Sequence, residues 1–212
     1  GKKIFFNNKH VEFENFIKGN IWGDFYKFFN NKSFVLSLIK LISPQLKLIE
    51  NRKDIKNYKF NKKFSNSFYN RALRKLLKLI SYQSIRVGFE FSIIKKDCFI
   101  PPHCDIENKL LSLMIYFPPE KKLNLSREYF NLGTNFYDKK IDAKKNLDVW
   151  QSTYLDRENS KIFYDNYKIF YKSNFEENKL VGFIKNDKSW HDVSAFSQDL
   201  LRKSLNINLY IE

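Results

Sequence analysis

Apolar and polar positions alternate with a period of two through much of the chain after residue 84. Between residues 85 and 93 every second side chain is apolar, with Arg, Gly, Glu and Ser between them, which is typical of a β-strand. Further strands are predicted over residues 110–117, 180–184 and 205–211, with turn residues such as Pro118-Pro119 at their ends. We therefore expect a fold that is mainly β, with flanking helices.

The first third of the chain has helical spacing instead. Residues 33–42 form an apolar run that Ser33 can cap and that is expected to end near Pro44. A polar connection follows over about 51–63. Residues 67–82 then place aliphatic side chains on one helical face and basic side chains on the other. Such a basic helix can lie on a membrane or contact phosphate, but more often it covers a sheet.

Length and composition favour one domain. The 212 residues, of which 43% are hydrophobic, can bury a substantial core. We expect a single domain over 1–212, with a helical part at 1–83 whose helices pack on one sheet, and a β core at 84–212. The segment at about 138–175 is aromatic and long for a hairpin connection. It is interpreted as an insertion that forms a lid, a substrate wall or a small core of its own.

The net charge of +15 would ordinarily indicate nucleic acid, an anionic membrane or an acidic substrate. Acidic residues are scattered among the basic ones, however, and the abundance of Lys, Asn, Ile, Phe and Tyr is typical of an AT-rich coding sequence. We interpret the charge mainly as a solvated surface. With only two cysteines, Cys98 and Cys104, a reducing compartment is favoured, so we expect a cytoplasmic protein with no transmembrane segment.

Candidate chemistry begins with an H-x-D motif formed by His103 and Asp105. On an extended segment these two side chains share a face. A second His from a distant strand would complete two nitrogens and one oxygen on one side of a metal, the arrangement that suits Fe(II). His191 is the best candidate, because His10 has no acidic partner at ligand spacing. The alternative is that H-x-D lies in a turn and bonds only to backbone or solvent.

The last predicted strand has one apolar face and one polar face. The polar face extends back to Arg202 and Ser204 and includes Asn206 and Asn208. It indicates either a solvated sheet surface or the wall of a cavity with a polar occupant. An Arg side chain beside a hydroxyl suits a carboxylate.

Together these motifs resemble the Fe(II)- and 2-oxoglutarate-dependent oxygenases, in particular the prolyl-hydroxylase-like branch. That family has H-x-D, a distal His and then an Arg, often in R-x-S, and the resemblance covers roughly residues 84–211. It implies that His103, Asp105 and His191 are the catalytic metal ligands for Fe(II), with 2-oxoglutarate and O2 as co-substrates.

The same resemblance assigns the remaining site residues. It implies that Arg202, with Ser204, holds the far carboxylate of 2-oxoglutarate. Tyr116, on the strand after H-x-D, is implied as a further co-substrate-binding residue, and residues 132–137 resemble the Gly-led strand that follows in this family. Asp105 and His191 are far apart in the sequence, and a double-stranded β-helix, or jelly roll, is a fold that brings such strands together.

The resemblance implies a hydroxylase that acts on an unactivated C–H bond, with succinate and CO2 as co-products. The substrate stays open among small molecules, sugars, lipids and peptidyl side chains, and so does the oligomeric state. Two alternatives are kept. A nucleic-acid demethylase of the same superfamily would fit the positive charge, although that branch typically carries a second Arg shortly after the first, and residues 203–212 contain none. The other alternative is a non-catalytic jelly-roll binding module.

Overall fold

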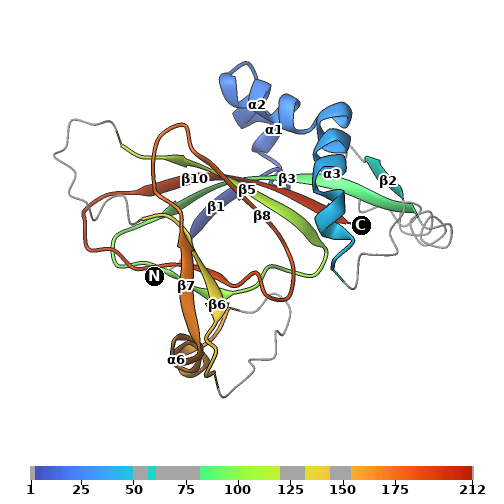
Figure 1. Ribbon diagram of the computed structural model, residues 1–212. Helices are drawn as coiled ribbons and strands as arrows, with labels where there is room; N and C mark the ends of the chain where they lie inside the picture. The colour runs from blue at the N-terminus through green and yellow to red at the C-terminus, as the bar shows by residue number, and fades with distance from the viewer. Residues whose placement is uncertain (1–2, 50–56, 61–81, 120–131, 144–153, 212) are drawn as a thin grey trace. The chain divides into compact units, whose positions relative to one another are not determined.

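The computed structural model describes residues 3–49, 57–60, 82–119, 132–143 and 154–211 (Figure 1). These residues form mainly β-strands with a few helices, as the sequence predicts. In chain order the elements are β1 (Ile4–Asn7), α1 (Phe13–Ile17), α2 (Ile21–Phe29), α3 (Lys32–Leu46), β2 (Asn57–Phe60), β3 (Tyr82–Ile94), β4 (Ile100–His103), β5 (Lys109–Phe117), β6 (Asn135–Lys139), α6 (Arg157–Asn166), β7 (Tyr167–Lys172), β8 (Leu180–Ile184), β9 (His191–Val193) and β10 (Arg202–Ile211). None of the described helices has the length and apolar character needed to cross a membrane.

The chain forms two compact units. The first contains Gly1–Phe5, Phe91–Glu107 and Leu113–Asn206, and the second contains Phe6–Glu90, Asn108–Ser112 and Ile207–Glu212. Strands β3, β5 and β10 contribute residues to both units. Every residue of the site predicted from the sequence belongs to the first unit.

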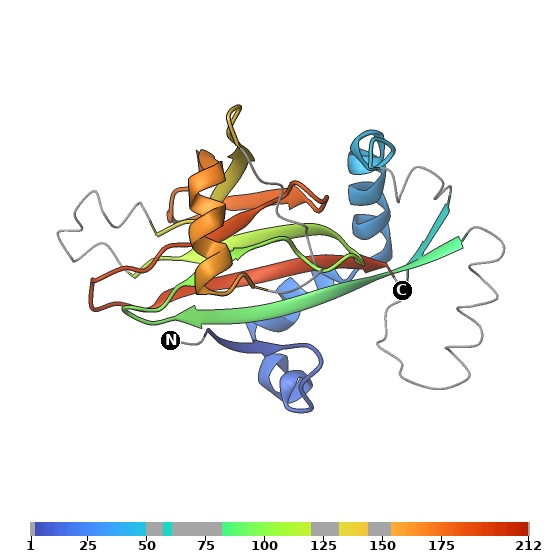
Figure 2. The ribbon, with the colours of Figure 1, turned by 90° about the horizontal axis from the view of Figure 1, so that it is seen from below.

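The strands form two sheets. One has the strand order β4-β9-β6-β7, with antiparallel pairs, and belongs wholly to the first unit. The other has the order β1-β3-β10-β5-β8, with β2 parallel to β3. Helix α6 covers one face of the four-stranded sheet, where Phe163 packs with Tyr137 and Trp190 (Figure 2).

The alternation of apolar and polar positions predicts the main strands correctly. Strands β3, β5, β8 and β10 cover the expected ranges 85–93, 110–117, 180–184 and 205–211. The Gly-led segment becomes a strand only from Asn135 onward, in β6. Within the segment 138–175, residues 157–172 form α6 and β7, and β7 pairs with β6 as a member of the sheet.

The helical predictions need correction. Helix α3 ends at Leu46, near Pro44 as expected but with the proline inside it, and Asn31 rather than Ser33 caps its first turn. Pro44 has no N–H to donate to the carbonyl of Lys40, and the Ser43 hydroxyl donates to that oxygen instead, at 2.9 Å. Part of the expected polar connection forms β2.

One predicted N-terminal helix is not described by the structure, and three N-terminal elements were not predicted. The amphipathic helix predicted over 67–82 lies outside the described residues, except for Tyr82, which begins β3. Strand β1 and the separate helices α1 and α2 were not predicted. In the second unit, Phe13 of α1 and Tyr26 of α2 contact Phe89 of β3, with ring centroids 6.0 and 5.5 Å apart. These N-terminal helices therefore pack on a sheet strand.

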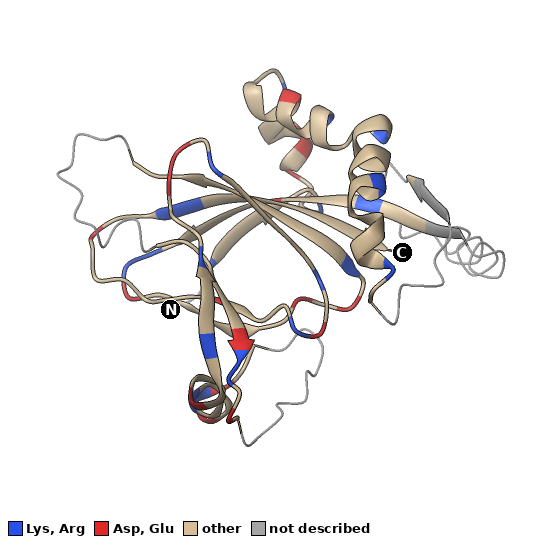
Figure 3. Ribbon diagram, in the orientation of Figure 1, with Lys and Arg blue, Asp and Glu red and all other residues tan. Residues whose placement is uncertain are grey.

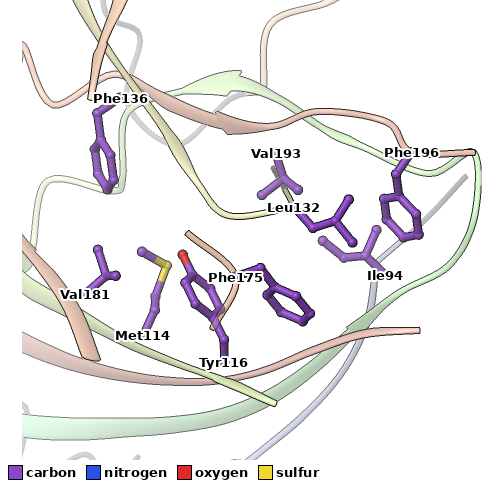
Figure 4. Packing of buried hydrophobic residues seen from close by; sticks show 9 residues of the cluster. All are labelled: Ile94, Met114, Tyr116, Leu132, Phe136, Phe175, Val181, Val193 and Phe196. Carbon is purple, nitrogen blue, oxygen red and sulfur yellow. The ribbon is translucent and has the colours of Figure 1, made fainter. Parts of the chain in front are cut away.

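A cluster of buried apolar side chains forms a core of the first unit (Figure 4). Its members come from both sheets and from the segments that connect their strands: Ile94, Met114, Tyr116, Leu132, Phe136, Phe175, Val181, Val193 and Phe196. The chain approaches itself closely beside this cluster, because a Cβ added at Gly133 would lie 1.6 Å from the carbonyl oxygen of Ser173. Only glycine allows that approach without a shift of the backbone.

Candidate metal centre

The structure brings together the three residues of the predicted triad. His103 is the last residue of β4 and His191 the first of β9, and the two are register partners in the antiparallel β4–β9 ladder. Their ring centroids are 4.2 Å apart. One potential ligand atom from each of His103, Asp105 and His191 lies within 4.8 Å of the others. This spacing allows all three to contact one ion.

Backbone carbonyls orient both imidazole rings. Nδ1 of His103 lies 2.9 Å from the carbonyl oxygen of Pro101, and Nδ1 of His191 lies 2.9 Å from that of Ser189. A carbonyl oxygen only accepts hydrogen bonds, so Nδ1 is the protonated nitrogen of each neutral ring. Nε2 then presents its lone pair, which is the form of histidine that binds metals, with the second nitrogen held by a backbone group.

Aromatic rings surround the triad. Phe183 lies 4.7 Å from the His191 ring between centroids, and Phe136 stacks on the same ring at 6.1 Å. Phe136 is buried, whereas Tyr154, 4.7 Å from the His103 ring, is 53% exposed. The triad therefore has one buried and one partly buried aromatic neighbour at His191 and an exposed one at His103.

Arg202 is buried, with 2% of its surface exposed. Its Nε donates to the carbonyl oxygen of Leu132 and its Nη2 lies 3.5 Å from Oγ1 of Thr134. Burial lowers the pKa of Arg202, which the nearby Tyr116 opposes. Within the described part of the chain, no Asp or Glu forms an ion pair with Arg202. A buried cation without an anion is costly, so this position suits an anionic ligand.

Tyr116 lies directly beside Arg202, whose Cζ is 5.1 Å from the centre of the tyrosine ring. The Tyr116 hydroxyl lies 3.0 Å from Oγ1 of Thr134 and 2.8 Å from Oγ of Ser173. The three hydroxyls thus form one cluster, in which that of Thr134 faces the guanidinium. Thr134 and Ser173 were missed from the sequence, and no local motif marks either residue.

Ser204 forms a hydrogen bond with a serine of the neighbouring strand. Its Oγ lies 2.8 Å from Oγ of Ser92 in the neighbouring strand β3, and no hydrogen bond joins it to Arg202 among the described contacts. The polar face of β10 is nevertheless buried at Arg202, Ser204 and Asn208. This excludes the solvated sheet surface that the sequence left open.

The triad and Arg202 border the same buried cluster. Arg202 contacts Tyr116 and Phe175, and His191 contacts Phe136, and all three of these aromatic residues belong to that cluster (Figure 4). A potential metal group and a potential anion group are therefore connected through one apolar core in the first unit.

No protein-family model and no curated protein matches the chain. Several solved structures are similar at low identity, and the following three are among them. A prolyl-4-hydroxylase from Pseudomonas putida is 12% identical, over 59% of this chain and 49% of its own, with a TM-score of 0.33. A 2OG-Fe(II) oxygenase family oxidoreductase from Burkholderia pseudomallei is 13% identical, over 70% of this chain and 61% of its own, with a TM-score of 0.34.

The third is HygX from Streptomyces hygroscopicus with nickel, 2-oxoglutarate and hygromycin B bound. It is 13% identical over 69% of this chain and 65% of its own, with a TM-score of 0.36. HygX is also known with iron bound. The chain spans about half of the length of the prolyl-4-hydroxylase. With TM-scores below 0.5, these similarities assign no function to the chain.

Proposed function

We propose that the chain is an Fe(II)- and 2-oxoglutarate-dependent oxygenase of the prolyl-hydroxylase-like branch. It would hydroxylate an unactivated C–H bond of a small molecule, sugar, lipid or peptidyl side chain. The observation that carries the proposal is the convergence of His103, Asp105 and His191, with ligand atoms within 4.8 Å of one another and both imidazoles oriented through Nδ1.

The donor set fits Fe(II). Two imidazole nitrogens and one carboxylate oxygen on one side of an ion leave open positions for co-substrates, as in non-haem iron oxygenases. His103, Asp105 and His191 would hold the metal. When bound, Fe(II) and 2-oxoglutarate supply oxidising power from O2, with release of succinate and CO2.

Arg202 would bind the far carboxylate of 2-oxoglutarate. Its burial without an ion-pair partner among the described residues supports this role, because a carboxylate would compensate the charge. The carbonyl of Leu132 and the hydroxyl of Thr134 orient the guanidinium before any ligand arrives. Tyr116 fixes Thr134 in turn, so we assign it a supporting role in the same subsite.

The strand order supports a jelly roll as the architecture of the core. Along the chain, β3, β5, β8 and β10 belong to one sheet, and β4, β6, β7 and β9 belong to the other. Successive strands from β3 to β10 thus alternate between sheets, apart from β6 and β7, which are antiparallel neighbours in one sheet. This is the pattern expected when a hairpin is wound into two facing sheets, and it places ligands from distant parts of the sequence on adjacent strands.

The proposal is tested by O2-dependent conversion of 2-oxoglutarate to succinate in the presence of Fe(II) and a reductant. Asp105→Ala should abolish succinate formation, whereas Asp142→Ala, at an exposed turn, should not. Wild-type succinate formation by Asp105→Ala would refute the ligand assignment. A folded wild-type protein that never consumes 2-oxoglutarate would favour the binding module.

The nucleic-acid alternative has a separate test. In the described residues Lys and Arg occur on helices, strands and loops, with Asp and Glu among them (Figure 3). This dispersal does not favour a phosphate-binding surface. Oligonucleotide binding that weakens steeply as salt is raised would revive the demethylase hypothesis.

A further inference from the structure

A buried carboxylate lies immediately next to the metal ligand His191 in the sequence. Strand β9 has only three residues, His191–Val193, and successive side chains of a strand point to opposite faces of the sheet. Asp192 therefore points away from the face that carries the triad. Only 2% of its surface is exposed.

Three donors hold Asp192 on that second face. Asn135 Nδ2 donates to Oδ1 at 2.6 Å, and the hydroxyls of Tyr137 and Tyr164 donate to Oδ2 at 2.8 and 2.7 Å. Asn135 and Tyr137 come from β6, whereas Tyr164 comes from α6. Burial, together with the charge and hydrogen bonds of Asp192, raises the pKa of both tyrosines, so they stay protonated donors.

These contacts solvate a negative charge but do not neutralise it. No Lys, Arg or His forms an ion pair with Asp192 within the described ranges. Lys172 is the register partner of Asn135 on β7, so β6 separates Lys172 from Asp192. A buried anion that has hydrogen bonds but no counter-charge attracts a cation placed nearby in the low-dielectric interior.

We propose that Asp192 strengthens metal binding at the triad as a buried counter-charge on the opposite face of the same strand. This inference rests on the proposed metal centre. The reach of two side chains on opposite sides of one strand puts the carboxylate about 10 Å from an ion bound by His191. Asp192 is thus too far away to be a ligand. At that distance, with little water between them, a carboxylate and a divalent ion still attract each other appreciably.

The hydrogen bonds explain how the chain keeps these two carboxylates in different roles. Asp105 follows β4 in a loop, and one of its carboxylate oxygens lies at the metal position. Asp192 is held on the far side by β6 and α6, so it contributes charge without competing for a coordination position. Asn135, Tyr137 and Tyr164 are positioning residues for that charge.

The test is titration of metal-free protein with Co(II), a redox-stable probe. Asp192→Asn keeps the size of the side chain and removes its charge, and we expect its dissociation constant to rise about tenfold to a hundredfold. The Co(II) absorption spectrum should keep its shape, because the three ligands are unchanged. Tyr164→Phe removes one hydrogen bond and keeps the charge, so its dissociation constant should change less than about threefold.

Two results would overturn the inference. One is that Asp192→Asn binds Co(II) with wild-type affinity, and the other is that Tyr164→Phe loses as much Co(II) affinity as Asp192→Asn. If Asp192→Asn does not fold, the pair Asp192→Glu and Asp192→Gln replaces it, and Glu should bind Co(II) at least about tenfold more tightly than Gln. Equal affinities in this pair would refute the role of charge.

His191→Ala separates this inference from the proposed function. If the wild-type protein binds no Co(II), or His191→Ala binds it equally well, the metal centre itself is wrong. If His191→Ala loses binding while Asp192→Asn keeps it, only the role of Asp192 is wrong.

Discussion

The variant Arg202→Met tests whether Arg202 binds 2-oxoglutarate or stabilises the fold. Methionine keeps a long apolar side chain and removes the guanidinium. The carbonyl of Leu132 and the hydroxyl of Thr134 lose a donor, which costs about 1–3 kcal/mol. Removing a buried cation that has no ion-pair partner among the described residues returns several kcal/mol of desolvation. The ligand-free protein should therefore change in stability by less than about 2 kcal/mol.

Arg202→Met should weaken the binding of 2-oxoglutarate far more than it changes the stability of the ligand-free protein. Loss of one partner of a buried charge pair costs about 2–5 kcal/mol, which weakens the affinity about 30-fold to several thousandfold. At a concentration 100 times its dissociation constant, 2-oxoglutarate stabilises the wild-type protein by about 2.7 kcal/mol. If Arg202→Met binds 100-fold more weakly, the same concentration adds only about 0.4 kcal/mol.

The assay is thermal unfolding under anaerobic conditions with Mn(II), with and without 2-oxoglutarate, supported by calorimetric titration. The wild-type shift should be roughly 5–10 °C for a chain of this size. Lys203→Met is the matched control, because Lys203 is the next residue of β10 and is exposed. An unchanged 2-oxoglutarate affinity in Arg202→Met would refute the assignment, and so would equal losses in the two variants.

Three further predictions concern stability and reactivity. Gly133→Ala should destabilise the fold by more than about 2 kcal/mol in urea unfolding, because its Cβ would meet the Ser173 carbonyl at 1.6 Å; an unchanged midpoint would contradict this. Tyr116→Phe removes the hydroxyl contacts to Thr134 and Ser173 and should lower the free energy of unfolding by about 1–3 kcal/mol, measured in the same way. Burial raises the pKa of Cys104 from 9.0 to about 12, so iodoacetamide at pH 8 should alkylate it only after unfolding. Because the folded-state pKa is the higher one, the stability contribution of this thiol should be complete below pH 9.0 and be lost as pH rises toward 12.

The local patterns of the sequence predict much of the fold and of the site. Alternation of apolar and polar positions identifies β3, β5, β8 and β10, because the side-chain period of a strand is visible without tertiary information. The H-x-D spacing selects His103 and Asp105 as a pair, although Asp105 lies in the loop after β4, and scarcity of histidine makes His191 their best partner. These features could be predicted because they depend on neighbouring residues, or because the chain has only three histidines to choose from.

Features that depend on tertiary contacts could not be predicted. Ser173 lies in a segment expected to be an insertion, and only the fold brings it to Tyr116. The sequence around Asp192 does not mark it, because its hydrogen-bond donors come from β6 and α6, which are distant in the chain. The burial of the polar face at Arg202 depends likewise on the segments around β10. At Pro44 a local signal differs from the structure. Proline disfavours a helix interior, yet α3 includes Pro44, and the Ser43 hydroxyl donates to the carbonyl oxygen of Lys40 in place of the missing N–H.

Anaerobic addition of Fe(II) and 2-oxoglutarate to metal-free protein tests the proposed centre most directly, with visible absorption followed for the weak charge-transfer band of the chelate. A band is predicted for the wild-type protein, none for His103→Ala, and a band that needs more 2-oxoglutarate for Arg202→Ala. No band at any concentration, in a protein shown to be folded, would contradict the Fe(II) and 2-oxoglutarate centre and favour a binding module.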